Sequence, residues 1–254
     1  TSSGTGTFGS VVRFALAQDS VVFSNCTFTG PATTSNNVNF AVLNHGTAAV
    51  DSVKRFNLLN CQIVNGSYGV YMQGNTNVTP FENKNTLSGN TFLNNNYIGM
   101  YARFQRNLTI TGNTVNQGVN ANTAGSGIYL DFCDTFRVEK NNINYFGQYG
   151  IYLSSANYQQ GTGTVYSTLV NNIVGGYHSN SAAYGIFFAN ITPQGSRYLK
   201  IYHNSVSVIS SSTGPALNFQ QTTTGVFDYL DIRNNSFANF GNGTYACYFY
   251  YSTG

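Results

Sequence analysis

Apolar positions recur along the chain in one short phrase: an apolar residue, two further residues, Asn, one residue, and a second apolar residue. The phrase is clearest at 110–115, 201–206 and 232–237. When the Asn position is taken as an anchor, eight anchors follow one another at intervals of 23 to 35 residues. These anchors are Cys26, Cys61, Asn90, Asn113, Asn141, Asn172, Asn204 and Asn235.

Large apolar residues flank every anchor on both sides. The residues three positions before the anchors are Phe23, Leu58, Leu87, Ile110, Val138, Leu169, Ile201 and Ile232. The residues two positions after them are Phe28, Ile63, Phe92, Val115, Ile143, Val174, Val206 and Phe237. Short alternating segments bounded by Gly and Asn are typical of strands joined by tight turns. We therefore predict one inward-facing strand on each side of every anchor.

A second phrase, Gly-apolar-Tyr-apolar, follows in most repeats. It begins at Gly69, Gly99, Gly127, Gly150 and Gly185 and has looser versions at 216–219 and 246–249. Because side chains alternate between the two faces of a strand, the residue after each Gly faces inward and the aromatic residue faces outward. An outward aromatic row is predicted, comprising Tyr71, Tyr101, Tyr129, Tyr152 and Phe187.

These repeats predict an all-β solenoid of about eight coils. One repeat cannot bury its apolar side alone, but strands stacked about 4.8 Å apart close their backbone hydrogen bonds and share one core. The anchors would then form a structural ladder, in which each Asn takes the left-handed turn conformation and passes amide hydrogen bonds between coils. We expect residues 1–254 to be a single domain, with 1–19 as an entry segment or incomplete coil and 20–254 as the eight coils.

The Asn-x-apolar phrases and the Gly-Ile-Tyr-Leu phrases at 127–130 and 150–153 resemble those of the right-handed parallel β-helix proteins of the pectin-lyase-like superfamily. More narrowly, residues 20–254 resemble the Asn-rich repeat segments of large secreted or cell-surface bacterial proteins. The resemblance implies a right-handed parallel β-helix and an extracellular or cell-surface location in bacteria. It does not imply one activity, because this fold carries lyases, glycosidases, adhesins and stalks.

Composition narrows the range of partners. Charged residues make up 7% of the chain, against roughly 25% in ordinary soluble domains, so neutral polar residues, with 35 Asn, maintain solubility. The net charge of +3 without a basic run argues against nucleic acid. No apolar run approaches the ~18 residues that cross a membrane, so no membrane insertion is expected. We expect no cofactor.

Candidate catalytic residues are few. The resemblance implies clustered acids with an Arg or Lys in lyases, and two or three Asp with a His in a Gly-His-Gly turn in hydrolases. Hydrolysis of a glycosidic bond needs two carboxyl groups facing one spot. Asp131 and Asp134 are the only acids close together near a strand end, and Arg103 should neighbour Asp131 on the adjacent coil. His45 follows Asn44 instead of Gly, so the hydrolase turn is only partly present.

The outward Tyr row leaves two interpretations open. Exposed rings beside polar groups can stack on sugars, which would make a polysaccharide-binding surface of Tyr71, Tyr101, Tyr129, Tyr152, Arg103 and Asp131. Alternatively, the rings cover the sheet and Arg103 pairs with Asp131, since cross-strand pairs contribute up to about 1 kcal/mol without any ligand. A long aromatic row is also suited to a lateral contact with another chain.

The four cysteines lack the CxxC spacing of metal sites, so we expect no metal. Cys26 and Cys61 occupy anchor positions in adjacent coils, where parallel Cβ vectors are less suited to a disulfide than to two stacked thiols. Cys133 and Cys247 are expected to be free, with Cys247 in the core.

Three functions from different classes remain. The first is a non-catalytic extracellular β-solenoid segment that acts as a stalk, adhesin or assembly module. The alternatives are a polysaccharide-binding module, and a lyase or glycosidase that uses Asp131, Asp134 and Arg103. Neither end carries a recognisable cap, so we expect the segment to belong to a longer chain or an assembly. Its expected partners are further copies of itself or neighbouring domains, and a polysaccharide under the second hypothesis.

Overall fold

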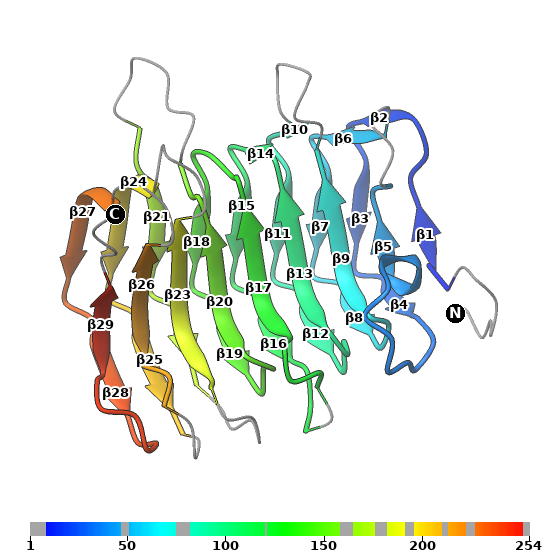
Figure 1. The fold of residues 1–254 in the computed structure, drawn as a ribbon. Helices are drawn as coiled ribbons and strands as arrows, with labels where there is room; N and C mark the ends of the chain where they lie inside the picture. The colour runs from blue at the N-terminus through cyan, green and yellow to red at the C-terminus, as the bar shows by residue number, and fades with distance from the viewer. Residues whose placement is uncertain are drawn as a thin grey trace.

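In the computed structural model, the chain winds as a right-handed parallel β-helix with three long sheets (Figure 1). The structure describes residues 9–46, 51–74, 82–119, 121–157, 165–175, 182–190, 196–209, 213–221 and 227–250. Each coil adds one strand before its anchor, one strand after it, and one strand of a nine-stranded sheet. We call the two eight-stranded sheets the pre-anchor sheet and the post-anchor sheet. All strand pairs between successive coils are parallel.

The strands are short, and their bounds repeat from coil to coil. The nine-stranded sheet consists of β1 (Val12–Arg13), β5 (Leu43–Asn44), β9 (Tyr68–Gln73), β13 (Ile98–Arg103), β17 (Ser126–Asp131), β20 (Tyr149–Ser154), β23 (Tyr184–Asn190), β26 (Leu217–Gln221) and β29 (Cys247–Tyr250). The pre-anchor sheet consists of β3 (Val22–Ser24), β7 (Asn57–Leu59), β11 (Thr86–Ser88), β15 (Thr109–Thr111), β18 (Arg137–Glu139), β21 (Ser167–Val170), β24 (Ser196–Tyr202) and β27 (Phe227–Arg233). The post-anchor sheet consists of β4 (Thr27–Thr29), β8 (Gln62–Val64), β12 (Thr91–Leu93), β16 (Thr114–Asn116), β19 (Asn142–Asn144), β22 (Ile173–Val174), β25 (Ser205–Val208) and β28 (Ser236–Asn239).

Smaller elements complete the described part of the chain. The expected entry segment contributes β1 and β2 (Ala17–Asp19), and β2 pairs with β6 (Ser52–Lys54). A second two-stranded sheet joins β10 (Glu82–Asn83) to β14 (Gln105–Arg106), and η1 (Val38–Phe40) is one turn of 3-10 helix. None of the described residues forms a helix that is long and apolar enough to cross a membrane.

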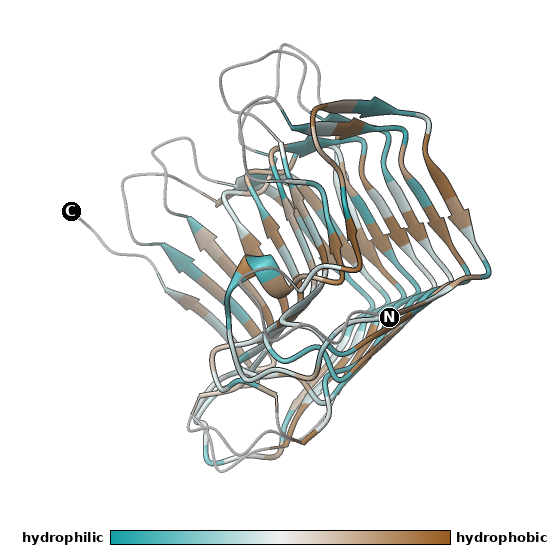
Figure 2. Cartoon of the chain, turned by 90° about the vertical axis from the view of Figure 1, so that its right-hand side faces the viewer, coloured by the Kyte–Doolittle hydropathy of each residue, from teal (hydrophilic) through white to brown (hydrophobic). Residues whose placement is uncertain are grey.

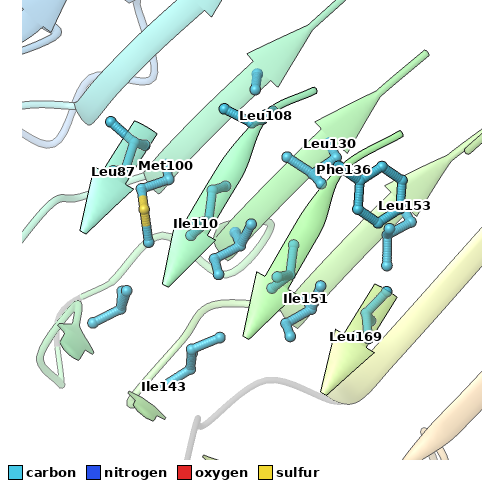
Figure 3. Close-up of a cluster of buried hydrophobic side chains, with 14 of the residues drawn as sticks. Leu87, Met100, Leu108, Ile110, Leu130, Phe136, Ile143, Ile151, Leu153 and Leu169 are labelled. Atoms are coloured by element: carbon cyan, nitrogen blue, oxygen red, sulfur yellow. The ribbon is translucent and has the colours of Figure 1, made fainter. Parts of the chain in front are cut away.

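The predicted inward positions are confirmed as one continuous core. Residues three before and two after successive anchors are direct partners, as in Ile110 with Val138 and Val115 with Ile143. Ile110, Ile143 and Ile151, one from each long sheet, point into the same interior (Figure 3). Seen from the end of the first coils, the apolar strands of successive coils follow one another along the same sheets (Figure 2). Stacking therefore buries the apolar side chains of every coil, which a single coil could not bury alone.

The Gly that opens the second phrase is required by close packing. A Cβ atom on Gly127 would lie 2.6 Å from Cγ2 of Ile143 and 2.7 Å from the carbonyl oxygen of Gly150 in the next coil. Gly99 and Gly150 face the next coil in the same way. The nine-stranded sheet can thus approach the post-anchor sheet only where this position lacks a side chain.

The anchors form the predicted ladder. Asn113 donates its backbone N–H and its side-chain Nδ2 to Oδ1 of Asn141, each at 3.0 Å, and Asn141 contacts Asn172 in the same way at 3.1 and 3.0 Å. Asn141 Nδ2 also donates to the carbonyl of Ile110 at 3.0 Å. The series runs from Asn90 to Asn235, and Cys61 donates its backbone N–H to Oδ1 of Asn90.

The expected left-handed conformation of the anchors is wrong by one position. The residue before each anchor, not the anchor, has positive φ; these residues are Asn25, Asn60, Gly89, Gly112, Lys140, Asn171, His203 and Asn234. This residue makes the sharp turn between the two strands, which leaves the anchor free to point inward and bond to the next coil. Lys140 and His203 also adopt the conformation, although Lys is not a residue type enriched there.

Candidate functional site

The outer face of the nine-stranded sheet carries the predicted aromatic row. Tyr71, Tyr101, Tyr129, Tyr152 and Phe187 are direct partners on β9, β13, β17, β20 and β23. The rings of Tyr71 and Tyr101 stack at 4.9 Å, those of Tyr101 and Tyr129 meet edge to face at 5.2 Å, and those of Tyr129 and Tyr152 stack at 4.3 Å. The row is thus continuous across four successive coils, each of which contributes one tyrosine.

These rings are less accessible than the sequence suggested. Tyr71 is buried and Tyr101, Tyr129 and Tyr152 are half-buried, so the expectation of exposed rings is wrong. A second set of aromatic residues lies against the row: Tyr68 contacts Tyr71 at 5.3 Å, and Tyr149 stacks on Tyr152 at 4.6 Å. Burial raises the pKa of the Tyr101 and Tyr129 phenols, so both remain protonated. The row is largely a packed layer on the sheet.

Arg103 and Asp131 lie side by side on adjacent strands, as predicted. Arg103 Nε is 2.9 Å from Asp131 Oδ2, and the two residues are partners in the register of β13 and β17. The guanidinium also lies 4.7 Å from the ring centroid of Phe104 and 5.5 Å from that of Phe132. Burial raises the pKa of the Asp131 carboxyl, and Ser154 and Arg103 act in the opposite direction. The geometry is that of a structural ion pair sheltered by two rings.

Asp134 faces a different arginine. Its Oδ2 lies 3.5 Å from Arg106 Nη2, and Asp134 pairs through a parallel β-bridge with Arg106, not with Arg103. The candidate catalytic acids Asp131 and Asp134 are therefore each neutralised by a separate partner. Glycosidic hydrolysis requires the opposite, two carboxyl groups directed at one substrate atom.

All eight carboxylates of the chain are engaged within the fold. Glu82, whose pKa burial raises to about 7, accepts hydrogen bonds from the Val53 N–H and the Gln105 side chain. The remaining pairs are Asp19–Arg55, Asp51–Leu16 N–H, Asp131–Arg103, Asp134–Arg106, Glu139–Arg137, Asp228–Tyr229 N–H and Asp231–Arg233. Each acid thus already has a partner within the fold.

His45, the partial match to the hydrolase turn, is inside the solenoid. Its ring lies 5.0 Å from that of Phe14 and 4.7 Å from that of Phe56, both edge to face. Neither ring nitrogen has a hydrogen-bond partner among the described residues. Burial lowers the pKa of His45 to about 3, so the ring is neutral. It is a core residue and cannot meet a substrate at the surface.

A polar groove that sequence reasoning missed runs beside the post-anchor sheet. It has a volume of about 940 Å³ and is lined by Asn65, Asn94, Asn116, Gln117 and Tyr145, with a few small neighbours. Asn65, Asn94, Gln117 and Tyr145 follow the post-anchor strands of four successive coils, where backbone N–H groups bond to the next coil. The polar residues Asn65, Asn94 and Gln117 just after three of these strands were the available sequence signal.

All four cysteines are free, as predicted. The Cys26 backbone N–H lies 3.4 Å from Cys61 Sγ, so this sulfur takes the position that Asn Oδ1 has in the other coils. Cys247 is not in the core as expected: it takes the register position of Leu217, but is exposed on β29, the last strand of its sheet among the described residues. The described residues contain no group of three or more His, Cys, Asp or Glu that could hold a metal ion.

Two comparisons bear on the family. No curated protein matches the chain. The family model described as periplasmic copper-binding protein (NosD) matches residues 13–206, which is more than half of the chain and includes seven of the eight anchors, from Cys26 to Asn204. This family is a right-handed β-helix family of the pectin-lyase-like type, in agreement with the parallel coils described above. The chain belongs to the NosD periplasmic copper-binding protein family.

Proposed function

We propose that the chain is a non-catalytic β-solenoid module that works in the periplasm or outside the bacterial cell, as a stalk, adhesin or assembly element. The observation that carries the proposal is the engagement of all eight carboxylates within the fold. The family description as periplasmic supports the location. Further copies of the chain or neighbouring domains are the proposed partners, since stacked coils present long lateral surfaces.

A lyase or glycosidase that uses Asp131, Asp134 and Arg103 is the alternative, and it would require two ion pairs to be broken. Asp131 would have to leave Arg103, and Asp134 would have to leave Arg106, before either could act on a substrate. Separating a largely buried ion pair leaves an uncompensated charge, at a cost of about 3–5 kcal/mol. A catalytic role for these acids is therefore the weaker interpretation.

The experiment is incubation of the purified chain with pectin, polygalacturonate and alginate. Unsaturated products are followed by ultraviolet absorbance and new reducing ends by a colorimetric assay. We expect neither product. Product release that disappears in Asp131→Asn but persists in Asp19→Asn, an exposed-pair control, would refute the non-catalytic assignment.

A second candidate function, copper(I) binding, is favoured by the family description and by one feature of this chain. Cys26 and Cys61 place two soft ligands in adjacent coils, and thiolates select copper(I). Their thiols now donate to the carbonyls of Ser24 and Leu59 at 3.3 Å, so binding would release thiol protons. A bound copper(I) ion would supply a bridge between two coils.

Anaerobic titration against a chromogenic copper(I) chelator tests this candidate. We expect binding by the wild-type chain, loss of binding in Cys61→Asn, and unchanged binding in the buried control Cys133→Ser. Cys61→Asn extends the existing Asn ladder, so its thermal stability should match or exceed that of the wild type. Copper retention by Cys61→Asn would exclude this pair.

A further inference from the structure

The outer aromatic row is interrupted at one coil by an asparagine. Asn218 on β26 is the direct partner of Phe187 on the preceding coil and of Tyr248 on the following coil. The position that carries an aromatic ring in six coils therefore carries a short amide here. The two neighbouring coils keep their rings, so the row opens into a hollow.

This hollow is a defined pocket of about 390 Å³. Tyr184 lines it from the preceding coil, and Tyr245, Tyr248 and Tyr250 line it from the following one, with Asn218 and Gln220 between them. The rings of Tyr245 and Tyr248 lie parallel within 21° at 5.3 Å. Unlike the tyrosines of the central row, all three of these later tyrosines are exposed. The pocket thus combines accessible ring faces with side-chain amides.

Asn218 itself points to a ligand. Its side chain is only 3% exposed, yet its Oδ1 has no hydrogen-bond partner among the described residues. Buried polar atoms are nearly always bonded, because an unpaired acceptor loses its water without a replacement. Asn218 also lines the pocket, so a small rotation of its amide would bring Oδ1 to a donor bound there. An unpaired acceptor of this kind suits a hydroxyl or an N–H group of a ligand.

The lining sets the chemistry of that donor. The described lining residues are Tyr, Thr, Pro, Asn and Gln, and none of them is charged. Ring faces bind the C–H face of a sugar, while amides bond to its hydroxyl groups. A charged ligand would enter this pocket without a compensating charge. We propose that the pocket at Asn218 binds a neutral hexose unit of a glycan.

The site goes beyond the module function proposed above and does not depend on it. The polysaccharide-binding surface expected from the sequence was centred on Tyr101 and Tyr129, whose rings are half-buried against their neighbours. The pocket lies further along the same face, on β26 and β29, where the aromatic row is open. A long glycan could contact both regions, but the proposed hexose pocket is at Asn218.

A glycan array tests the proposal with the full chain. The array carries glucose, galactose and mannose oligosaccharides beside uronic-acid, sialylated and sulfated glycans, and the protein is applied over a concentration series. We expect binding to at least one neutral class and none to the acidic classes. Asn218→Phe continues the aromatic row and closes the pocket, and Tyr245→Ala removes an exposed ring. Each should weaken apparent affinity by about tenfold or more, as expected for one lost buried contact.

Two controls separate this pocket from other surfaces. Tyr145→Ala alters the Asn-lined groove, and the double variant Tyr101→Ala/Tyr129→Ala alters the centre of the row. Both should retain binding within about twofold, after circular dichroism has shown unchanged secondary structure. The proposal is overturned by an array without neutral-glycan binding, by preference for acidic glycans, or by full affinity in Asn218→Phe. Loss of binding confined to Tyr145→Ala or to the double variant would equally overturn it.

Discussion

Replacing Asn141 by Ala tests how much of the stability of this solenoid rests on its internal ladder. Asn141 lies in the middle of the series, buried on every side. Its Oδ1 accepts from the backbone N–H and from Nδ2 of Asn113, and its Nδ2 donates to the Ile110 carbonyl and to Asn172 Oδ1. Truncation to Ala removes all four of these hydrogen bonds at once.

The magnitude follows from the groups that lose a partner. The Asn113 N–H, the Asn113 amide and the Ile110 carbonyl lie in the interior, where water cannot replace the lost bond without a cavity. A buried group left unsatisfied costs about 1–3 kcal/mol. Some of the three groups find weaker alternatives through small shifts, so we expect a loss of about 3–5 kcal/mol in the free energy of unfolding.

Asn142→Ala is the matched control one residue away. Asn142 faces outward on β19, where its Oδ1 accepts from Asn144 Nδ2 at 3.1 Å. The same change of residue type there should cost less than about 0.5 kcal/mol. Urea unfolding followed by far-ultraviolet circular dichroism measures both variants. Equal midpoints for Asn141→Ala and Asn142→Ala would show that the ladder is not a main source of stability.

The remaining predictions concern charge. His45 has a folded pKa of about 3 against 6.5 when unfolded, so the unfolded chain takes up the proton first and the free energy of unfolding falls as pH drops below about 6.5. The loss should reach roughly 3 kcal/mol near pH 4. His45→Phe, measured by urea unfolding across this range, should remove that part of the pH dependence, whereas a pH profile identical to that of the wild type would contradict the prediction. Arg103→Ala leaves the buried Asp131 carboxylate without its partner and should cost about 2–3 kcal/mol. The exposed Arg137–Glu139 pair is its control, since Arg137→Ala should cost less than about 1 kcal/mol. Thermal melts decide between them, and equal losses in the two variants would contradict a structural role for the Arg103–Asp131 pair.

The fold could be predicted because the repeat specifies the same contact many times. An apolar residue such as Ile110 has one lateral neighbour in the coil before and one in the coil after, both at the same repeat position. The alignment of the repeats therefore predicts the register of the strands in the solenoid directly. The left-handed turn was misplaced by one residue because Lys140 and His203 occupy it in two coils and obscure the Gly and Asn found elsewhere.

The outer face was harder to predict because its burial depends on residues from other parts of the coil. Tyr68 packs on Tyr71 and also approaches Tyr97 and Tyr101. Ala41, which follows η1, belongs to the same small apolar cluster. Alternation predicts the side of the strand that a Tyr occupies, but not what covers it. For the same reason, the position of His45 in a turn-like sequence gave no sign that Phe14 and Phe56 enclose it.

Positions where one coil departs from the repeat identify residues whose role goes beyond holding the coils together. Cys61 replaces an anchor Asn, and its sulfur still lies within 3.4 Å of the neighbouring backbone N–H, so the ladder itself largely compensates for the change. Asn218 replaces an aromatic ring, and its Oδ1 remains buried without a bond among the described residues. A buried acceptor that the fold leaves unpaired destabilises it, whereas a Tyr or Phe would have continued the stack. Of the two departures, only Asn218 lacks a compensating bond within the part of the chain that the structure describes, and a bound hydroxyl group would supply one.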